Sequence, residues 1–252
     1  MNGPLLELDR VEAAYGPFRA LFGVSFTVQP GEAVALLGSN GAGKTTVARV
    51  CSGLLHPSAG TIRFEGEDVS SSKAFKLARR GISHAPEGRS VFASLTVEEN
   101  LELAFHQAFG RRGARAAVEE AYELFPRLGE RAAQHAGSLS GGEQRMLALA
   151  RVLVNPPRLL IVDELSLGLA PIIVNEVYQQ LARLKGKGIT LLVVEQHVEH
   201  ALALADRVVV LSRGEVSYQG PVIPIEELAP FFLPRQREAA EDQVGPERGD
   251  GR

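Results

Sequence analysis

The chain has 252 residues, 45% of them hydrophobic, and its 27 basic and 30 acidic residues give a net charge of −3. It can bury a sizeable core, and its acidic balance argues against a broad nucleic-acid-binding surface. One cysteine, Cys51, excludes a disulfide framework, suits a reducing cytoplasm, and is expected to be a packed core thiol. We expect neither a signal peptide nor a membrane-spanning segment, so any membrane role must go through a partner.

The first ninety residues predict a β-rich part around one glycine-rich loop. Alternating or short apolar runs indicate strands, and Gly53 would end the one predicted helix. The predicted elements are strands at 5–11, 21–28 and 32–37, a helix at 44–52, a hairpin from residue 61 and a strand at 82–85.

From about residue 90 strand signals give way to helical ones. Thr96 and Glu99 fit a capping box that opens a helix through about Phe109. A second helix is predicted at 114–125 and a third at 143–153, each ended by proline. We therefore expect a helical subdomain at about 90–154.

The remaining sequence alternates strand and helix, which predicts a mostly parallel sheet flanked by helices. Strands are predicted at 159–162, 189–194 and 208–211 and helices at 172–184 and 198–205, followed by a hairpin from Gly214. The expected fold is α/β, a single domain over 1–234 with its core at 1–89 and 155–234. Half of the last 18 residues are charged, so 235–252 is expected to be a disordered tail.

The segment that begins at Gly38 fits the phosphate-binding pattern G-x-x-x-x-G-K-[ST], between a predicted strand and a predicted helix. Its backbone amides and the positive helix N-terminus would bind phosphate oxygens. Lys44 would reach the β- and γ-phosphates of ATP, and the Thr45 hydroxyl would bind Mg²⁺. The alternative is a plain glycine-rich turn. The residues expected at the nucleotide are Gly38, Ser39, Asn40, Gly41, Ala42, Gly43, Lys44, Thr45 and Thr46.

Asp163 and Glu164 end a buried apolar strand. Ligands of open parallel sheets bind at the carboxyl ends of the strands, beside loops such as the one after Leu37. Asp163 would hold Mg²⁺ through water, and Glu164 would polarise the attacking water as general base. The alternative is that both merely cap the strand, but two buried carboxylates are costly without a cation or donor.

A second anion site is predicted where Ser140, Gly141, Gly142 and Glu143 open a helix. The serine could instead be an ordinary helix cap. Two phosphate sites at separate places in one chain suggest a head-to-tail dimer, with each ATP between the loop of one chain and the Ser140 segment of the other.

The order of these motifs, with Leu139-Ser-Gly-Gly-Glu143 between the phosphate loop and Asp163, resembles that of ABC ATPases from Leu5 to about Leu233. The resemblance implies a P-loop NTPase core with an N-terminal antiparallel β part and a helical ABC subdomain. It also implies that Tyr15 stacks on adenine, although Tyr15 could be a core tyrosine.

Within that family the chain resembles LivF-type ATPases of importers for branched-chain and other hydrophobic amino acids. The residues that carry this likeness are Ala85–Phe92, Leu95–Leu101, Ser166–Pro171 and Val194–Gln196. The likeness implies a partner ATPase of the LivG type or a second copy of the chain, two transmembrane permease subunits and an extracytoplasmic binding protein. The chain would lie on the inner face of the cell membrane.

Four positions depart from the usual ABC pattern. Glu87 replaces a glutamine that contacts Mg²⁺ and, unless it only faces solvent, would act as a metal ligand there. The register places Gln196, rather than the alternative His197, at the phosphate-sensing position. Ala170 replaces an aspartate, as in LivF-type proteins, and Leu165 replaces a proline. With Glu87, Gln196 and Ala170 together, hydrolysis at this chain's own site could be slow.

Three rival functions remain open on the sequence. One is a soluble ABC ATPase that acts on DNA or the ribosome, another is a catalytically weak regulatory subunit, and the third is a transporter ATPase with other cargo, such as urea or a lipid.

Overall fold

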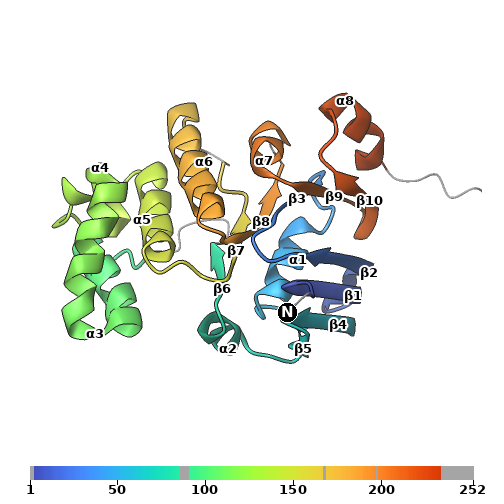
Figure 1. The fold of residues 1–252 in the computed structure, drawn as a ribbon, viewed down its shortest axis with the longest axis horizontal. Coiled ribbons are helices and arrows are strands. Elements are labelled where there is room, and N and C mark those ends of the chain that lie inside the picture. The colour runs from blue at the N-terminus through green and yellow to red at the C-terminus, as the bar shows by residue number, and fades with distance from the viewer. Residues whose placement is uncertain (1–2, 86–90, 167–168, 197, 234–252) are drawn as a thin grey trace, which may run out of the picture.

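A computed structural model of the chain describes residues 3–85, 91–166, 169–196 and 198–233. Its centre is a six-stranded sheet in the order β10-β9-β3-β8-β7-β6 (Figure 1). Five of these strands run parallel, and β10 pairs with β9 as an antiparallel hairpin. The strands are β3 (Ala33–Gly38), β6 (Ile82–Ala85), β7 (Leu159–Asp163), β8 (Thr190–Glu195), β9 (Arg207–Ser212) and β10 (Glu215–Pro221). The predicted parallel sheet is confirmed.

A second, antiparallel sheet is built from the N-terminal part in the order β2-β1-β4-β5. Its strands are β1 (Leu6–Tyr15), β2 (Phe18–Val28), β4 (Ala59–Phe64) and β5 (Glu67–Asp68). The turn between β4 and β5 is the predicted hairpin, and β2 begins three residues before the predicted strand. The N-terminal antiparallel β part is therefore present.

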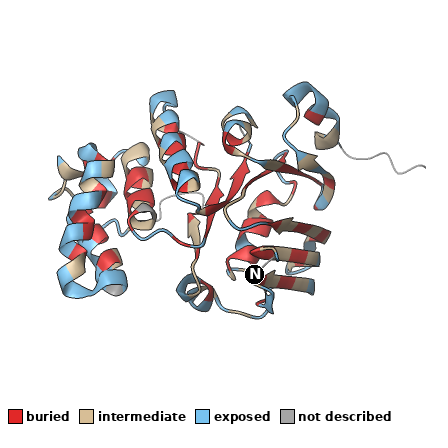
Figure 2. Ribbon diagram, viewed as in Figure 1, coloured by how far each residue is buried: buried red, intermediate tan, exposed pale blue. Residues whose placement is uncertain are grey.

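The central sheet separates two hydrophobic cores, because successive side chains of a strand point to opposite faces. Along β3, Val34 and Leu36 belong to the core shared with the second sheet and α1 (Lys44–Cys51). Ala35 and Leu37 belong to the core formed with the helices of the other face. Burial on both faces explains why β3, β7 and β8 are buried at every residue (Figure 2).

The predicted helical stretch forms α3 (Val97–Leu124), α4 (Pro126–Gly129) and α5 (Gly141–Leu153), with a 3₁₀ turn at Ala136–Ser138. Both halves of the predicted capping box are present, since Thr96 Oγ1 accepts from the Glu99 amide and Glu99 accepts from the Thr96 amide. Within α3, Gly110 has a non-helical backbone with φ 68°. That break separates the two helices that the sequence predicts.

The remaining helices are α2 (Ala74–Arg79), α6 (Pro171–Gly186), α7 (Val198–Leu204) and α8 (Ile225–Leu228), followed by a 3₁₀ turn at Ala229–Phe232. The sequence predicts α6 and α7 but not α2 or α8. Each of these two buries a single leucine, Leu77 or Leu228, which leaves no periodic pattern to detect. The tail predicted at 235–252 lies outside the described residues. In the part that is described, no helix is both long and apolar enough to cross a membrane.

Candidate functional site

The phosphate loop joins β3 to α1 as the sequence predicts. A Cβ at Gly38 would lie 2.5 Å from the carbonyl oxygen of Leu211, so only glycine fits where the loop leaves the sheet. Gly43 caps α1 with φ 102°, a backbone that glycine adopts without a steric penalty. The loop is held from outside because the Gly214 amide donates to the carbonyl of Ala42 at 2.9 Å. Ser39, Asn40 and Gly41 are exposed, whereas Ala42 and Thr46 are buried.

Lys44 is the first residue of α1, and its side chain is 3% exposed. Its Nζ donates to the carbonyl oxygens of Gly38 at 3.1 Å and Ser39 at 3.3 Å. The same Nζ lies 3.4 Å from Glu164 Oε1. The predicted phosphate-binding cation and the predicted general base thus form an ion pair.

The carboxyl ends of the parallel strands bring distant residues together. Thr45 Oγ1 donates to Asp163 Oδ1 at 3.3 Å, although 118 residues separate them in sequence. Glu164 follows β7 with φ 49°, a left-handed conformation that costs a non-glycine residue about 1–3 kcal/mol. Its amide donates to the carbonyl of Val194 in β8 at 2.9 Å. Such strain persists only where surrounding contacts hold it, as they do here.

Two further polar residues, which the sequence analysis missed, lie near the site, and one of them, His84, reaches Asp163. His84 on β6 places Nε2 3.9 Å from Asp163 Oδ2 and Nδ1 3.0 Å from Ser52 Oγ at the end of α1. Burial and the nearby charge of Arg49 lower the pKa of His84 to about 4, so the ring is neutral at pH 7. The sequence offered one signal, a histidine inside the predicted strand at 82–85, but the parallel pairing with β7 that brings it to Asp163 is seen only in the structure.

At the end of β8 the carboxylate of Glu195 is buried and the next residue, Gln196, is exposed. Glu195 is fully buried and accepts from the amide of Ser166 at 3.1 Å and from its hydroxyl at 2.8 Å. Gln196, predicted as the phosphate sensor, is exposed, and its backbone amide donates to Glu195 Oε2 at 3.3 Å. The alternative sensor His197 and the predicted metal ligand Glu87 both lie outside the described residues.

The second predicted anion site lies at the N-terminus of α5. Ser140 Oγ accepts from the Glu143 amide at 3.3 Å, while Glu143 Oε2 accepts from the Ser140 amide at 2.9 Å. Partial burial alone would raise the pKa of Glu143, but the Ser140 hydrogen bonds and the charges of Arg131 and Arg127 hold it below its ordinary value. Gly141 is exposed, and a Cβ there would meet nothing within 4 Å. The helix start is both capped and open to a ligand.

The phosphate loop and the Ser140 segment do not form one site within a chain. In Figure 1, α1 and α5 lie in separate parts of the molecule, on either side of β6 and β7. The head-to-tail dimer predicted from the sequence would bring the Ser140 segment of a second chain to a nucleotide in the loop.

The exposed fractions of Tyr15 and Cys51 test what the sequence predicts for these two side chains. Tyr15 is 40% exposed at the end of β1, so the alternative that it is a core tyrosine is wrong. Its hydroxyl accepts from Arg49 Nη1 at 3.2 Å, and the Arg49 guanidinium lies 5.9 Å from the ring centre. Cys51 is fully buried in the core beside α1, as expected.

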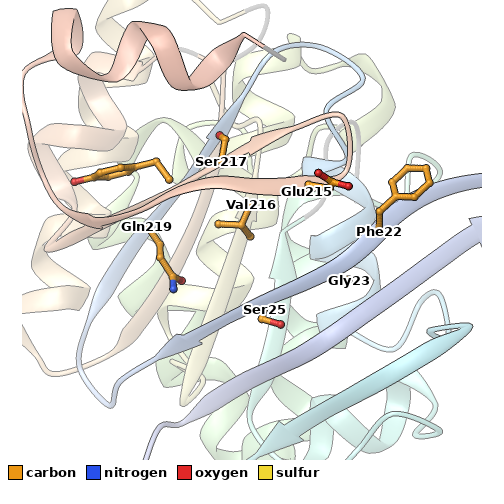
Figure 3. Close-up of a pocket in the computed structure, with 8 residues that line it drawn as sticks. Phe22, Gly23, Ser25, Glu215, Val216, Ser217 and Gln219 are labelled. Carbon is orange, nitrogen blue, oxygen red and sulfur yellow. The ribbon is translucent and has the colours of Figure 1, made fainter. Parts of the chain in front are cut away.

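An open hollow of about 450 Å³ lies elsewhere, between the edge strands β2 and β10 (Figure 3). Phe22 and Ser25 line it from one side and Glu215 and Gln219 from the other. None of the residues predicted to bind nucleotide lines it, so it is distinct from the candidate site.

Comparison with known proteins agrees with this geometry. A family profile described as ABC transporter matches residues 21–166, more than half of the chain. The high-affinity branched-chain amino acid transport ATP-binding protein BraG of Pseudomonas aeruginosa is 43% identical over 212 residues, 84% of this chain and 91% of BraG. A Nod factor export ATP-binding protein I of Burkholderia lata is 39% identical over 217 residues, 85% of this chain and 70% of that protein.

Among solved structures, a dimeric bacterial ABC transporter cassette superposes with a TM-score of 0.78 at 25% identity, covering 87% of this chain and 99% of that one. The P-loop NTPase fold that the sequence predicts is thereby confirmed.

Proposed function

The chain belongs to the ABC transporter family, and from this membership we propose that it is the ATP-hydrolysing subunit of an importer for branched-chain or other hydrophobic amino acids. The observation that carries ATP hydrolysis is the grouping of Lys44, Thr45, Asp163 and Glu164 at the carboxyl ends of β3 and β7. The proposal that the cargo is an amino acid rests on the likeness to BraG over most of both chains.

The donor set fits Mg²⁺. Thr45 and Asp163 place two oxygen ligands 3.3 Å apart, and hard oxygen ligands are what this ion prefers. Among the described residues no three His, Cys, Asp or Glu form a metal cluster, which suits an ion that takes its other ligands from water and phosphate. Thr45 and Asp163, with Glu87 from the segment that is not described, would hold Mg²⁺. The ion would neutralise charge on the phosphates.

ATP binding begins with an exchange of partners at Lys44. The β- and γ-phosphates take the place of Glu164 against Nζ, and the amides from Ser39 to Thr46 bind the remaining oxygens. Glu164 is then released to accept a proton from the attacking water, a role worth about 10²–10⁴-fold in rate. Gln196 donates a hydrogen bond to the γ-phosphate, and the exposed ring of Tyr15 stacks on adenine.

The second half of each site comes from another subunit. The Ser140 hydroxyl and the amides of Gly141, Gly142 and Glu143 contact the γ-phosphate bound by the partner's loop, which the positive end of α5 favours. Shared binding favours the closed dimer, and hydrolysis reopens it. The similar bacterial cassette is itself dimeric.

The surrounding assembly is inferred from the family. The chain would pair with a LivG-type ATPase or with itself, and two transmembrane permease subunits would hold the dimer on the inner face of the membrane. A binding protein outside the cell would deliver the amino acid. We also propose that 1–234 is one domain with a helical subdomain at 90–154, and that 235–252 is a disordered tail.

The chain's own site is proposed to be the slower of two in a pair with a LivG-type partner, because Glu87, Gln196 and Ala170 depart from the usual residues. Ala170 caps α6 without a side-chain hydrogen bond. If the purified chain alone hydrolysed ATP as fast as the whole transporter does, this asymmetry would be refuted.

The deciding experiment compares ATPase activity and gel filtration of wild type and Glu164→Gln in ATP and Mg²⁺. We expect wild type to hydrolyse ATP and the variant to accumulate as an ATP-held dimer. Hydrolysis by the variant at the wild-type rate would remove Glu164 from its role. Loss of radiolabelled leucine uptake on gene deletion, restored by wild type but not by Glu164→Gln, tests the cargo. Unchanged uptake would favour another cargo, as in the Nod factor export relatives.

A further inference from the structure

We propose that Arg145 is a positioning residue that transmits the docking of the partner's ATP at the Ser140 segment to Glu164 of its own chain. This inference rests on the proposed function. Arg145 lies in the second turn of α5, the helix whose N-terminus forms the Ser140 segment. Its side chain extends away from that helix, and the guanidinium reaches the residues that follow β7.

The contact is made with backbone at the proposed base. Arg145 Nη1 donates to the carbonyl oxygen of Glu164 at 3.3 Å and also to that of Leu165. Charge-assisted hydrogen bonds of this kind are about twice as strong as neutral ones. They hold the peptide group between Glu164 and Leu165.

The orientation of Glu164 depends on such support. Its backbone is in the left-handed region, with φ 49°. The amide is held from one side by Val194 of β8, and the carbonyl is held from the other side by Arg145. A shift of α5 would therefore move one of these two backbone hydrogen bonds of Glu164 while β8 keeps the other in place.

The position of Leu165 agrees with this arrangement. Its side chain is 4% exposed and packs in the helix-side core, so its backbone is anchored there while its carbonyl faces Arg145. The residue that departs from the usual proline is thus one of the two that Arg145 holds. Helix α5 then links a site completed by the partner's nucleotide to the base that acts on the chain's own nucleotide.

The rival explanation is that Arg145 acts on the partner's site, by shaping the Ser140 segment. The two explanations differ in which ATP is affected. Arg145 acting through Glu164 changes the site that contains its own phosphate loop. Arg145 acting through the Ser140 segment changes the opposite site.

Dimers with one substituted subunit distinguish between these two explanations of the role of Arg145. The other subunit is the wild-type chain, isolated with two affinity tags, or the natural partner ATPase if the chain does not pair with itself. The substituted subunit carries Glu164→Gln, Arg145→Gln or both. We expect Arg145→Gln to cause no further loss of ATPase activity when Glu164→Gln is already present in the same subunit. A further several-fold loss in the double variant would overturn the proposal.

The fully substituted dimer gives the second readout. Arg145→Gln in every copy should lower kcat by about 10- to 100-fold, as expected for a misplaced base, with KM for ATP within about two-fold of wild type. Arg145→Lys, which keeps one charged donor, should recover part of kcat. Arg112→Gln, at an exposed position of α3, is the charge-matched control and should behave as wild type.

The outcomes also distinguish this inference from the proposed function. If wild-type dimers hydrolyse ATP and Glu164→Gln abolishes it, but Arg145→Gln retains the wild-type kcat, only the inference fails. If wild-type dimers show no ATPase activity that Glu164→Gln removes, the proposed function fails and the inference fails with it.

Discussion

The ammonium of Lys44 lies 3.4 Å from the carboxylate of Glu164, and both side chains are largely buried. The predicted phosphate-binding cation and the predicted base are therefore paired with each other. In the proposed function, a nucleotide would break this ion pair and so release Glu164 beside the γ-phosphate. Nucleotide binding and activation of the base would then be one event.

The first prediction concerns that ion pair. Glu164→Gln should bind ADP without Mg²⁺ several-fold more tightly than wild type, because Lys44 no longer gives up a charged partner. Isothermal titration with ADP, which does not hold the dimer closed, isolates this effect. Glu119→Gln on the exposed face of α3 removes the same charge far from the loop and should leave the affinity unchanged. Equal affinities for wild type and Glu164→Gln would contradict the exchange mechanism.

The second prediction separates helix capping from ligand binding at Ser140. Ser140 and Thr96 both form complete capping boxes, on α5 and α3. Alanine at either position should lower the free energy of unfolding by about 1 kcal/mol. Only Ser140→Ala should also lower ATPase activity, by removing the hydroxyl that faces the partner's ATP. Equal activity losses in the two variants would assign the effect of Ser140 to capping alone.

The third prediction tests the close approach at Gly38. A methyl group there would lie 2.5 Å from the carbonyl oxygen of Leu211 and 3.0 Å from the Cβ of Ala42. Gly38→Ala should cost about 1–3 kcal/mol in urea unfolding and abolish ATP binding, since the loop must shift. Gly186→Ala, at the end of α6 with open space around it, should leave both unchanged or be slightly stabilising. ATP binding by a stable Gly38→Ala would show that the loop tolerates the displacement.

The fourth prediction concerns the buried thiol. Burial raises the pKa of Cys51 to about 12, so at pH 8 the thiol is neutral, unreactive and shielded from solvent. Iodoacetamide should leave the native protein unmodified for hours and label it fully in guanidinium, as followed by mass spectrometry. Rapid labelling of the native protein would mean that α1 opens readily.

Motifs whose residues are adjacent in sequence could be identified from the sequence. The glycines, Lys44 and Thr45 of the phosphate loop act through local backbone geometry, and a spacing rule captures that geometry. The Ser140 and Thr96 capping boxes are likewise local, and both are present. The alternation of strand and helix after residue 159 sufficed to predict the parallel sheet, because burial on both faces leaves continuous apolar runs.

Contacts between residues far apart in sequence were beyond such rules. Nothing local indicates that His84 faces Asp163, that Lys44 pairs with Glu164, or that Arg145 holds the carbonyl beside the base. The left-handed backbone of Glu164 is also a tertiary outcome, since contacts from β8 and α5 must offset its strain.

The sequence by itself determined the family, the candidate nucleotide-binding residues and the succession of strands and helices along the chain, because these depend on local spacing and hydrophobic period. Only the tertiary structure decided which charges meet. Strand order in the sheet places the ends of β3, β7 and β8 side by side, and strand order is set by packing across the whole core.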